Sequence, residues 1–146
     1  MVRKSTALIA AICGTLVLLL LFFGGRMLFI QHHTESFDKL IAEDARTALV
    51  LRENGVDLRT LNTPEQTAPV LTLLGGYTYT EYPHFLRPDS DELRGNRLTV
   101  VFTDGDSIGV DADGYVLING KVRDVQNSEG KALYQELYRI FYPNAV

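Results

Sequence analysis

The stretch RLTVVFTDGDSIGVDADGYVLINGKVRDV, residues 97 to 125, decides the fold of the part of the chain to which it belongs. Two Asp-Gly pairs and one Asn-Gly pair divide it into four short runs rich in Val, Ile and Leu. These dipeptides are the strongest short signals of β-hairpins, because type I′ turns need a positive φ at both central residues. The stretch therefore predicts an antiparallel meander of four strands over 97–103, 107–111, 115–118 and 121–125.

Weaker patterns predict the elements before the meander. Apolar residues at three- and four-residue spacing predict a helix over Ser36–Glu53, which the pair Asn54-Gly55 would end. Thr63, followed by Pro64, favours the start of a second and shorter helix that ends at Gly75-Gly76. Alternating aromatic and polar residues over 77–82 predict one more strand, and residues 83–96 form a long polar loop.

Residues 128–141 predict a C-terminal helix with one apolar face, formed by Leu133, Leu137, Ile140 and Phe141. A sheet with one apolar face needs cover, and this helix can supply it. The expected fold class is α+β. A single N-terminal transmembrane helix precedes a small domain in which the antiparallel β-meander packs against helices.

The N-terminal run ALIAAICGTLVLLLLFFGG, residues 7–25, holds 19 residues and no charge. As a helix it would be about 29 Å long, which matches a hydrocarbon core of about 30 Å. Arg26 interrupts the run, and apolar residues resume as far as Ile30. We expect a transmembrane signal anchor over 7–30. The residues expected to contact lipid are Leu8, Ile12, Leu16, Leu20 and Phe23.

A cleaved signal peptide is the main alternative for this run. Its apolar region would be about 7–15 residues long and followed by small residues in an A-x-A-like pattern. Here the run is longer, and its end reads FFGGRML. Arg3 and Lys4 precede the run, so the positive-inside rule predicts a cytoplasmic N-terminus and an external C-terminal domain in a cell membrane. Small residues four apart, such as Ala10 and Gly14, would let two copies of this helix approach closely, so a homodimer is an alternative.

These patterns divide the chain into a cytoplasmic tail over 1–6, the anchor over 7–30, a juxtamembrane helix over 31–55 and an extracytoplasmic α+β domain over 56–146. Three of the 14 basic residues and none of the 18 acidic residues lie in residues 1–30, so the remainder has a net charge of −7. This charge argues against a nucleic-acid partner. The only cysteine, Cys13, lies in the apolar run, and a domain without disulfides favours a bacterial envelope protein.

No motif in the sequence predicts catalysis, a cofactor or a metal. Asp104, Asp106, Asp111 and Asp113 do not have the ligand spacing of an EF-hand, and we interpret them as turn-forming residues. The pair His32-His33 would point about 100° apart on a helix, which prevents easy chelation of one ion. Serines with a nucleophile motif and phosphate-binding loops are also missing from the sequence. We therefore expect that the protein is not an enzyme.

The aromatic residues carry the remaining functional signal. Tyr and Arg are enriched where protein surfaces bind partners. The loop that contains Tyr82, Phe85, Leu86 and Arg87 is the predicted partner contact. The alternative interpretation is that the aromatic residues of this domain fill the core of a small sheet.

The sequence as a whole favours a membrane-anchored, non-enzymatic interaction or accessory module of a bacterial envelope complex. Its expected partners are the lipid bilayer, through residues 7–30, and a membrane or envelope protein. One alternative is an extracytoplasmic ligand-sensing domain that signals through helix pairing, with a pocket between the meander and the terminal helix. Another is an envelope hydrolase, which would need convergent polar groups in the same cleft.

Overall fold

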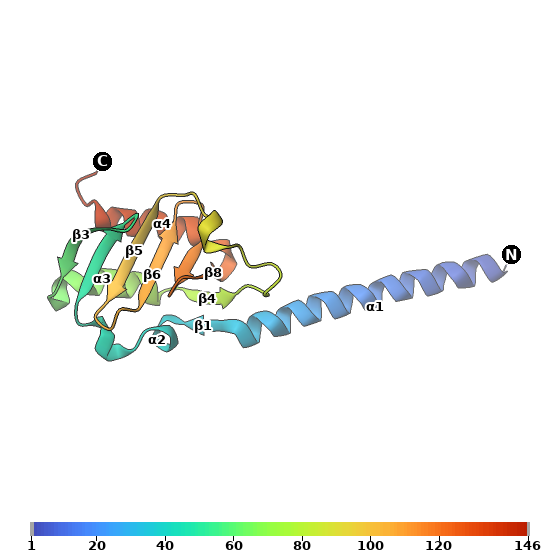
Figure 1. Ribbon diagram of the computed structural model, residues 1–146. Helices are drawn as coiled ribbons and strands as arrows, with labels where there is room; N and C mark the ends of the chain where they lie inside the picture. Colours follow the sequence, from blue (N-terminus) through green and yellow to red (C-terminus); the bar gives the residue numbers. More distant parts are fainter. Residues whose placement is uncertain (1, 146) are drawn as a thin grey trace. The chain divides into compact units, whose positions relative to one another are not determined.

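A computed structural model describes residues 2–145 and divides them into two units that meet between His33 and Thr34. Met1 and Val146, the ends of the predicted tail and of the predicted domain, lie outside the described residues. The N-terminal unit is one helix, and the C-terminal unit contains all the strands (Figure 1).

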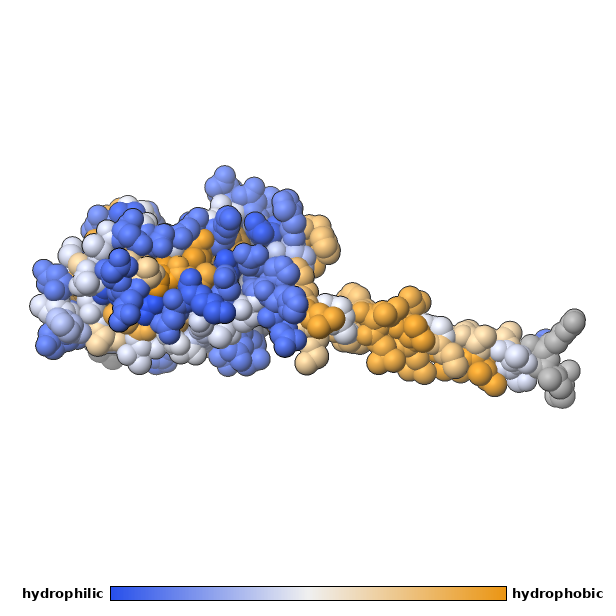
Figure 2. Space-filling model, turned by 90° about the horizontal axis from the view of Figure 1, so that it is seen from below, coloured by the Kyte–Doolittle hydropathy of each residue, from blue (hydrophilic) through white to orange (hydrophobic). Residues whose placement is uncertain are grey.

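The helix α1, Val2–His33, is continuous across Gly24-Gly25 and ends three residues beyond the predicted anchor. Lys4–His33 is long and apolar enough to cross a membrane, a property that signal sequences near an N-terminus share. Its apolar surface is exposed along its length (Figure 2). The hydroxyl of Thr15 donates to the carbonyl of Ala11 at 2.9 Å, so this polar group is satisfied within the helix.

The C-terminal unit is built on an eight-stranded antiparallel sheet with the strand order β1-β4-β8-β7-β6-β5-β2-β3. The predicted meander is confirmed as four consecutive neighbouring strands. These are β5 (Arg97–Phe102), β6 (Ser107–Asp111), β7 (Val116–Ile118) and β8 (Lys121–Val125). At the last turn, Asn119 and Gly120 have φ values of 52° and 79°, as a type I′ turn requires.

The predicted strand over 77–82 is β4, Thr78–Glu81. Both predicted helices that flank the meander are also confirmed, as α3 (Pro64–Gly75) and α4 (Gly130–Phe141). They pack against the sheet (Figure 1), and the apolar face of α4 is buried there through Leu133, Leu137 and Phe141. The core therefore lies between the sheet and these helices, as the fold class required.

The helix predicted over Ser36–Glu53 is wrong. This segment forms the strand β1 (Thr34–Ser36), one turn of helix α2 (Phe37–Leu40), a 3₁₀ turn (Glu43–Arg46) and the strand β2 (Leu49–Glu53). A further strand, β3 (Val56–Leu61), pairs only with β2 and forms one edge of the sheet. The juxtamembrane helix over 31–55 is therefore wrong too, because α1 ends at His33 and the helical turns that follow are short and separated by extended segments.

Side-chain contacts explain why a helix does not form in this segment. The guanidinium of Arg46 donates to the carbonyl of Ile41 and to Asp38, and it lies 4.5 Å from the ring centre of Phe37. These contacts bury Phe37 and Ile41 in compact turns. Leu49–Glu53 form β2 instead, which pairs with both β3 and β5. Asn54-Gly55 then forms a hairpin turn with φ values of 47° and 86°.

Candidate functional site

The strand β1 connects the apolar helix to the sheet. It begins at Thr34, the residue that directly follows α1, and its three residues pair antiparallel with β4. β1 is an edge strand, since β4 is its only neighbour. A three-residue edge strand has few backbone hydrogen bonds, so its side chains contribute much of what holds it in place.

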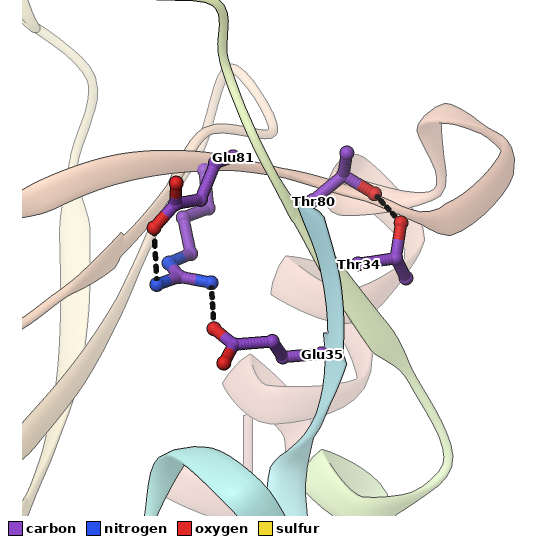
Figure 3. A network of polar contacts seen from close by, with 5 residues as sticks. Thr34, Glu35, Thr80 and Glu81 are labelled. Carbon is purple, nitrogen blue, oxygen red and sulfur yellow. Dashed lines mark hydrogen bonds and ion pairs between the residues drawn. The ribbon is translucent and has the colours of Figure 1, made fainter. Parts of the chain in front are cut away.

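A buried arginine holds this edge strand. In β8, Arg123 donates from Nη1 to Oε2 of Glu35 at 2.7 Å and from Nη2 to Oε1 of Glu81 at 3.0 Å (Figure 3). The side chain of Arg123 is 10% exposed, whereas those of Glu35 and Glu81 are 39% and 38% exposed. The guanidinium therefore joins three strands, with the two carboxylates reaching solvent. We name these three residues the Arg123 clamp.

The register of the sheet brings the Arg123 clamp together. Glu81 lies opposite Arg123 across the β4–β8 ladder, and Glu35 lies opposite Tyr79 across the β1–β4 ladder. Alternate residues of a strand share a face, so all three members of the clamp lie on the same face of the sheet as Tyr79. A charge on a central strand is costly to bury without a partner, and here two carboxylates offset that cost.

Two further hydrogen bonds fix β1 and β4. The hydroxyls of Thr34 and Thr80 lie 2.8 Å apart on paired residues (Figure 3). The fully buried Tyr79 donates its hydroxyl to the carbonyl of Leu74, near the end of α3, at 2.8 Å. Burial raises the pKa of Tyr79 well above its ordinary value, so the phenol stays protonated and remains a donor. β4 is thereby bound to α3 on one side and to β1 on the other.

A second polar network joins the end of α4 to the turn between β2 and β3. Glu53 accepts hydrogen bonds from the hydroxyl of Tyr142 and, at 2.7 Å, from Nδ2 of Asn96. The same amide nitrogen lies 2.9 Å from the hydroxyl of Tyr134. These hydrogen bonds lower the pKa of Glu53, and the bond to Glu53 raises the pKa of Tyr142 to about 12.

The predicted partner contact divides into exposed and half-buried residues. Residues 83–86 form a turn in which the backbone N–H of Leu86 donates to the carbonyl of Pro83 at 2.9 Å. Phe85 is 85% exposed and Leu86 is 62% exposed. Tyr82 and Arg87 are half-buried instead, and burial raises the pKa of Tyr82 to about 12. Only Phe85 and Leu86 therefore present large apolar surfaces together, and their role as a contact stays a prediction.

The residues predicted to contact lipid all lie on the exposed surface of α1. Leu8, Ile12, Leu16, Leu20 and Phe23 are between 52% and 72% exposed. In a bilayer, lipid would cover this surface.

Asp104 and Asp111 of the meander stabilise their own turns, and Oδ2 of the fully buried Asp111 has no hydrogen-bond partner among the described residues. Oδ1 of Asp104 accepts from the backbone N–H of Asp106 at 2.9 Å, and Oδ1 of Asp111 accepts from that of Asp113 at 2.6 Å. Such bonds stabilise turns. Among residues 2–145, no three His, Cys, Asp or Glu side chains come together in a way that could hold a metal ion. On α1, Nδ1 of His33 bonds to the carbonyl of Phe29 at 2.9 Å.

A groove of about 660 Å³ lies between α3 and α4, lined among others by Pro69 and Leu73 of α3 and by Arg139 and Ile140 of α4. It is therefore not between the meander and the terminal helix, where the ligand-sensing alternative would need a pocket. That interface is filled by buried apolar side chains of α4 such as Leu133 and Leu137. In the groove, Arg139 pairs with Glu136, also a lining residue, at 2.7 Å.

Sequence reasoning missed the Arg123 clamp. The sequence did contain a signal, because Arg123 is two residues from Val125 and Glu81 is two residues from Tyr79. This spacing places a charged residue on the same strand face as an apolar or aromatic one in each strand. No local pattern could identify Glu35 as the partner of Arg123, because the two residues lie 88 positions apart in the sequence. No family of known proteins, no curated protein and no solved structure matches the chain.

Proposed function

We propose that the protein is a membrane-anchored, non-enzymatic interaction module of a bacterial envelope complex, with its C-terminal unit outside the cytoplasm. One observation carries the proposal: no residue separates α1 from β1, and the Arg123 clamp holds β1 in the sheet. A flexible linker of n residues has a reach of roughly 5–6 Å × √n. Without such a linker, the sheet stays at the membrane surface, and its partner must lie there too.

Three polar groups of the C-terminal unit whose charges are bound within the fold support a non-enzymatic role. Glu53, Tyr142 and Asn96 bind one another, and the charges of the Arg123 clamp are paired. In the groove between α3 and α4, the cation Arg139 is already paired with Glu136. Each of these groups has a structural partner in the fold. Partner binding at a surface uses shape and exposed side chains and needs no free acid, base or nucleophile.

The anchor and its orientation are tested by thiol labelling in a bacterial host. Replacing Cys13→Ser removes the only cysteine, and Ala132→Cys then places a thiol at an exposed position of α4. A membrane-impermeant maleimide should label Ala132→Cys in intact cells, whereas the matched variant Thr6→Cys should react only after lysis. The reverse pattern would overturn the orientation. Recovery of a shortened chain in the soluble fraction would overturn the anchor.

The role of the direct connection is tested by changing its length. A Gly/Ser linker of about ten residues is inserted between His33 and Thr34. The unaltered chain, cross-linked in membranes and purified, should give one reproducible membrane or wall protein. The inserted linker should reduce that product, whereas the same linker added after residue 145 should not. Equal yields from all three chains would contradict the proposal.

A ligand-sensing module that signals through helix pairing is the second candidate. It is favoured by the groove between α3 and α4, and by the Arg123 clamp, which joins a central strand to the strand after α1. A ligand of the groove should raise the melting temperature of the full chain. It should also change the rate at which Cys13 forms a disulfide between two copies. A ligand that raises the melting temperature and leaves that rate unchanged would refute signalling through α1.

A further inference from the structure

The direction of the strands shows which loop lies at the same end of the sheet as the junction with α1. The end of the sheet at which β1 begins is the end at which the chain leaves α1, because Thr34 is joined directly to His33. β4 runs antiparallel to β1, and Thr80 is the partner of Thr34. β4 therefore finishes, at Glu81, beside the start of β1. The turn over residues 83–86 follows within two residues and emerges at this same end.

The turn over residues 83–86 exposes two large apolar side chains. Phe85 and Leu86 are adjacent, 85% and 62% exposed, and neither belongs to the buried core or to the apolar residues packed against it. The bond from the N–H of Leu86 to the carbonyl of Pro83 closes the turn. Beside them, Arg87 is half-buried, and its Nε has no hydrogen-bond partner. Adjacent exposed apolar side chains surrounded by polar residues mark surfaces that contact a membrane or a partner protein.

We propose that Phe85 and Leu86 insert into the interfacial region of the same bilayer that α1 spans. The inference rests on the proposed membrane anchor, which keeps the tip at a high effective concentration near the lipid. Attraction to anionic headgroups does not drive the insertion, since residues 31–146 carry a net charge of −7. The driving force is burial of the two apolar side chains of the turn.

Another exposed apolar residue lies at the opposite end of the sheet and provides a control. Following the registers across the sheet, β2 begins at the end where β4 finishes, so the turn at 54–55 lies at the far end. Val56, which follows this turn, is 64% exposed, nearly the same as Leu86. A general tendency of exposed apolar residues to contact lipid would affect Val56 and Leu86 alike. Insertion guided by the fold affects only the turn over residues 83–86.

The chain contains no tryptophan, so a single introduced indole reports on its own surroundings. The full-length variants Phe85→Trp, Leu86→Trp and Val56→Trp are reconstituted into phosphatidylcholine vesicles with brominated acyl chains. Phe85→Trp and Leu86→Trp should emit at shorter wavelength than Val56→Trp, and bromine should quench them at least twofold more strongly. Co-flotation of each variant with the vesicles is measured on the same samples.

The outcomes separate this inference from the anchor on which it rests. If the variants float with the vesicles and both indoles of the turn are quenched no more than Val56→Trp, lipid insertion is overturned, and the turn is left to contact a protein. If the variants do not float with the vesicles, the membrane anchor itself fails. Stronger quenching of either indole of the turn in floated protein supports the proposal.

Discussion

Arg123 and Glu35 are joined by a 2.7 Å ion pair that passes over β4, from the third-last residue of β8 to the middle residue of β1. The same guanidinium also pairs with Glu81 of β4, so the clamp joins the edge strand β1 to both β8 and β4. The clamp thus links the strand that follows α1 to β8, two strands into the sheet.

Replacing Arg123→Ala should destabilise the C-terminal unit by about 1–3 kcal/mol. The change leaves two carboxylates without a cation, and because both are more than one third exposed, water offsets part of the loss. Urea unfolding of the full chain in detergent, followed by circular dichroism, measures the effect. The matched variant Arg139→Ala removes an exposed pair within α4 and should change stability by no more than about 0.5 kcal/mol. Equal losses in both variants would contradict the role of the clamp.

The Tyr142–Glu53 bond should make stability depend on pH in acid. The pKa of Glu53 is lowered in the folded chain from an ordinary value of 4.5, so the folded state binds fewer protons than the unfolded state near that pH. The stabilisation that ionised Glu53 contributes to the folded state is present above pH 4.5 and is lost as the pH falls through the lowered pKa. Tyr142→Phe should therefore reduce the loss of melting temperature between neutral and acid pH. Identical pH profiles for the two chains would show that the bond contributes nothing.

Gly130→Ala should be among the most damaging single changes in α4. A Cβ at this position would lie 1.8 Å from the backbone carbonyl oxygen of Gly114, in the turn between β6 and β7. Relief requires a backbone shift that lifts the start of α4, and we expect a loss of about 3 kcal/mol in thermal or urea unfolding. Gly105→Ala is the control, because Gly105 has a φ of 92° but no atom within 4 Å. Its cost should be only about 1–2 kcal/mol of backbone strain.

Tyr79→Phe should cost about 1–2 kcal/mol, because the carbonyl of Leu74 loses a buried donor while the ring still fills the core. Hydrogen exchange should also show faster opening of β1 and β4, since Tyr79 binds β4 to α3. The control is Tyr138→Phe, which removes the hydroxyl of an exposed tyrosine of α4. Its change should stay within about 0.5 kcal/mol. A smaller loss for Tyr79→Phe than for the control would refute this role of the hydroxyl.

The meander could be predicted because its determinants are local. Each Asp-Gly or Asn-Gly pair specifies a turn by itself, and Leu98, Val100 and Phe102 alternate with less buried residues in β5. The terminal helix is equally local, since its apolar stripe repeats over only 12 residues. Such elements need no knowledge of distant partners.

The first strands could not be predicted in the same way. Asn54-Gly55 suits both the end of a helix and a hairpin, and the spacing of Phe37, Ile41 and Ala45 suits a helix. The alternation of Leu49 and Leu51 decides the question only once β5, about 50 residues later, is placed beside β2. The Arg123 clamp likewise depends on contacts between distant parts of the chain.

The short edge strand β1 also constrains the order in which the chain acquires its structure. In the proposed orientation the N-terminus stays in the cytoplasm, and Thr34–Ser36 would be the first residues of the C-terminal unit to emerge behind the anchor, whereas β4 would follow only after more than 40 residues. Arg123 arrives later still, 88 residues after Glu35. Local hairpins such as β5–β6 form quickly once synthesised. If the C-terminal unit is exported as proposed, the segment that follows the anchor would be the first to arrive and among the last to pair with its neighbours, which would expose it to chaperones and proteases until the C-terminal third has followed.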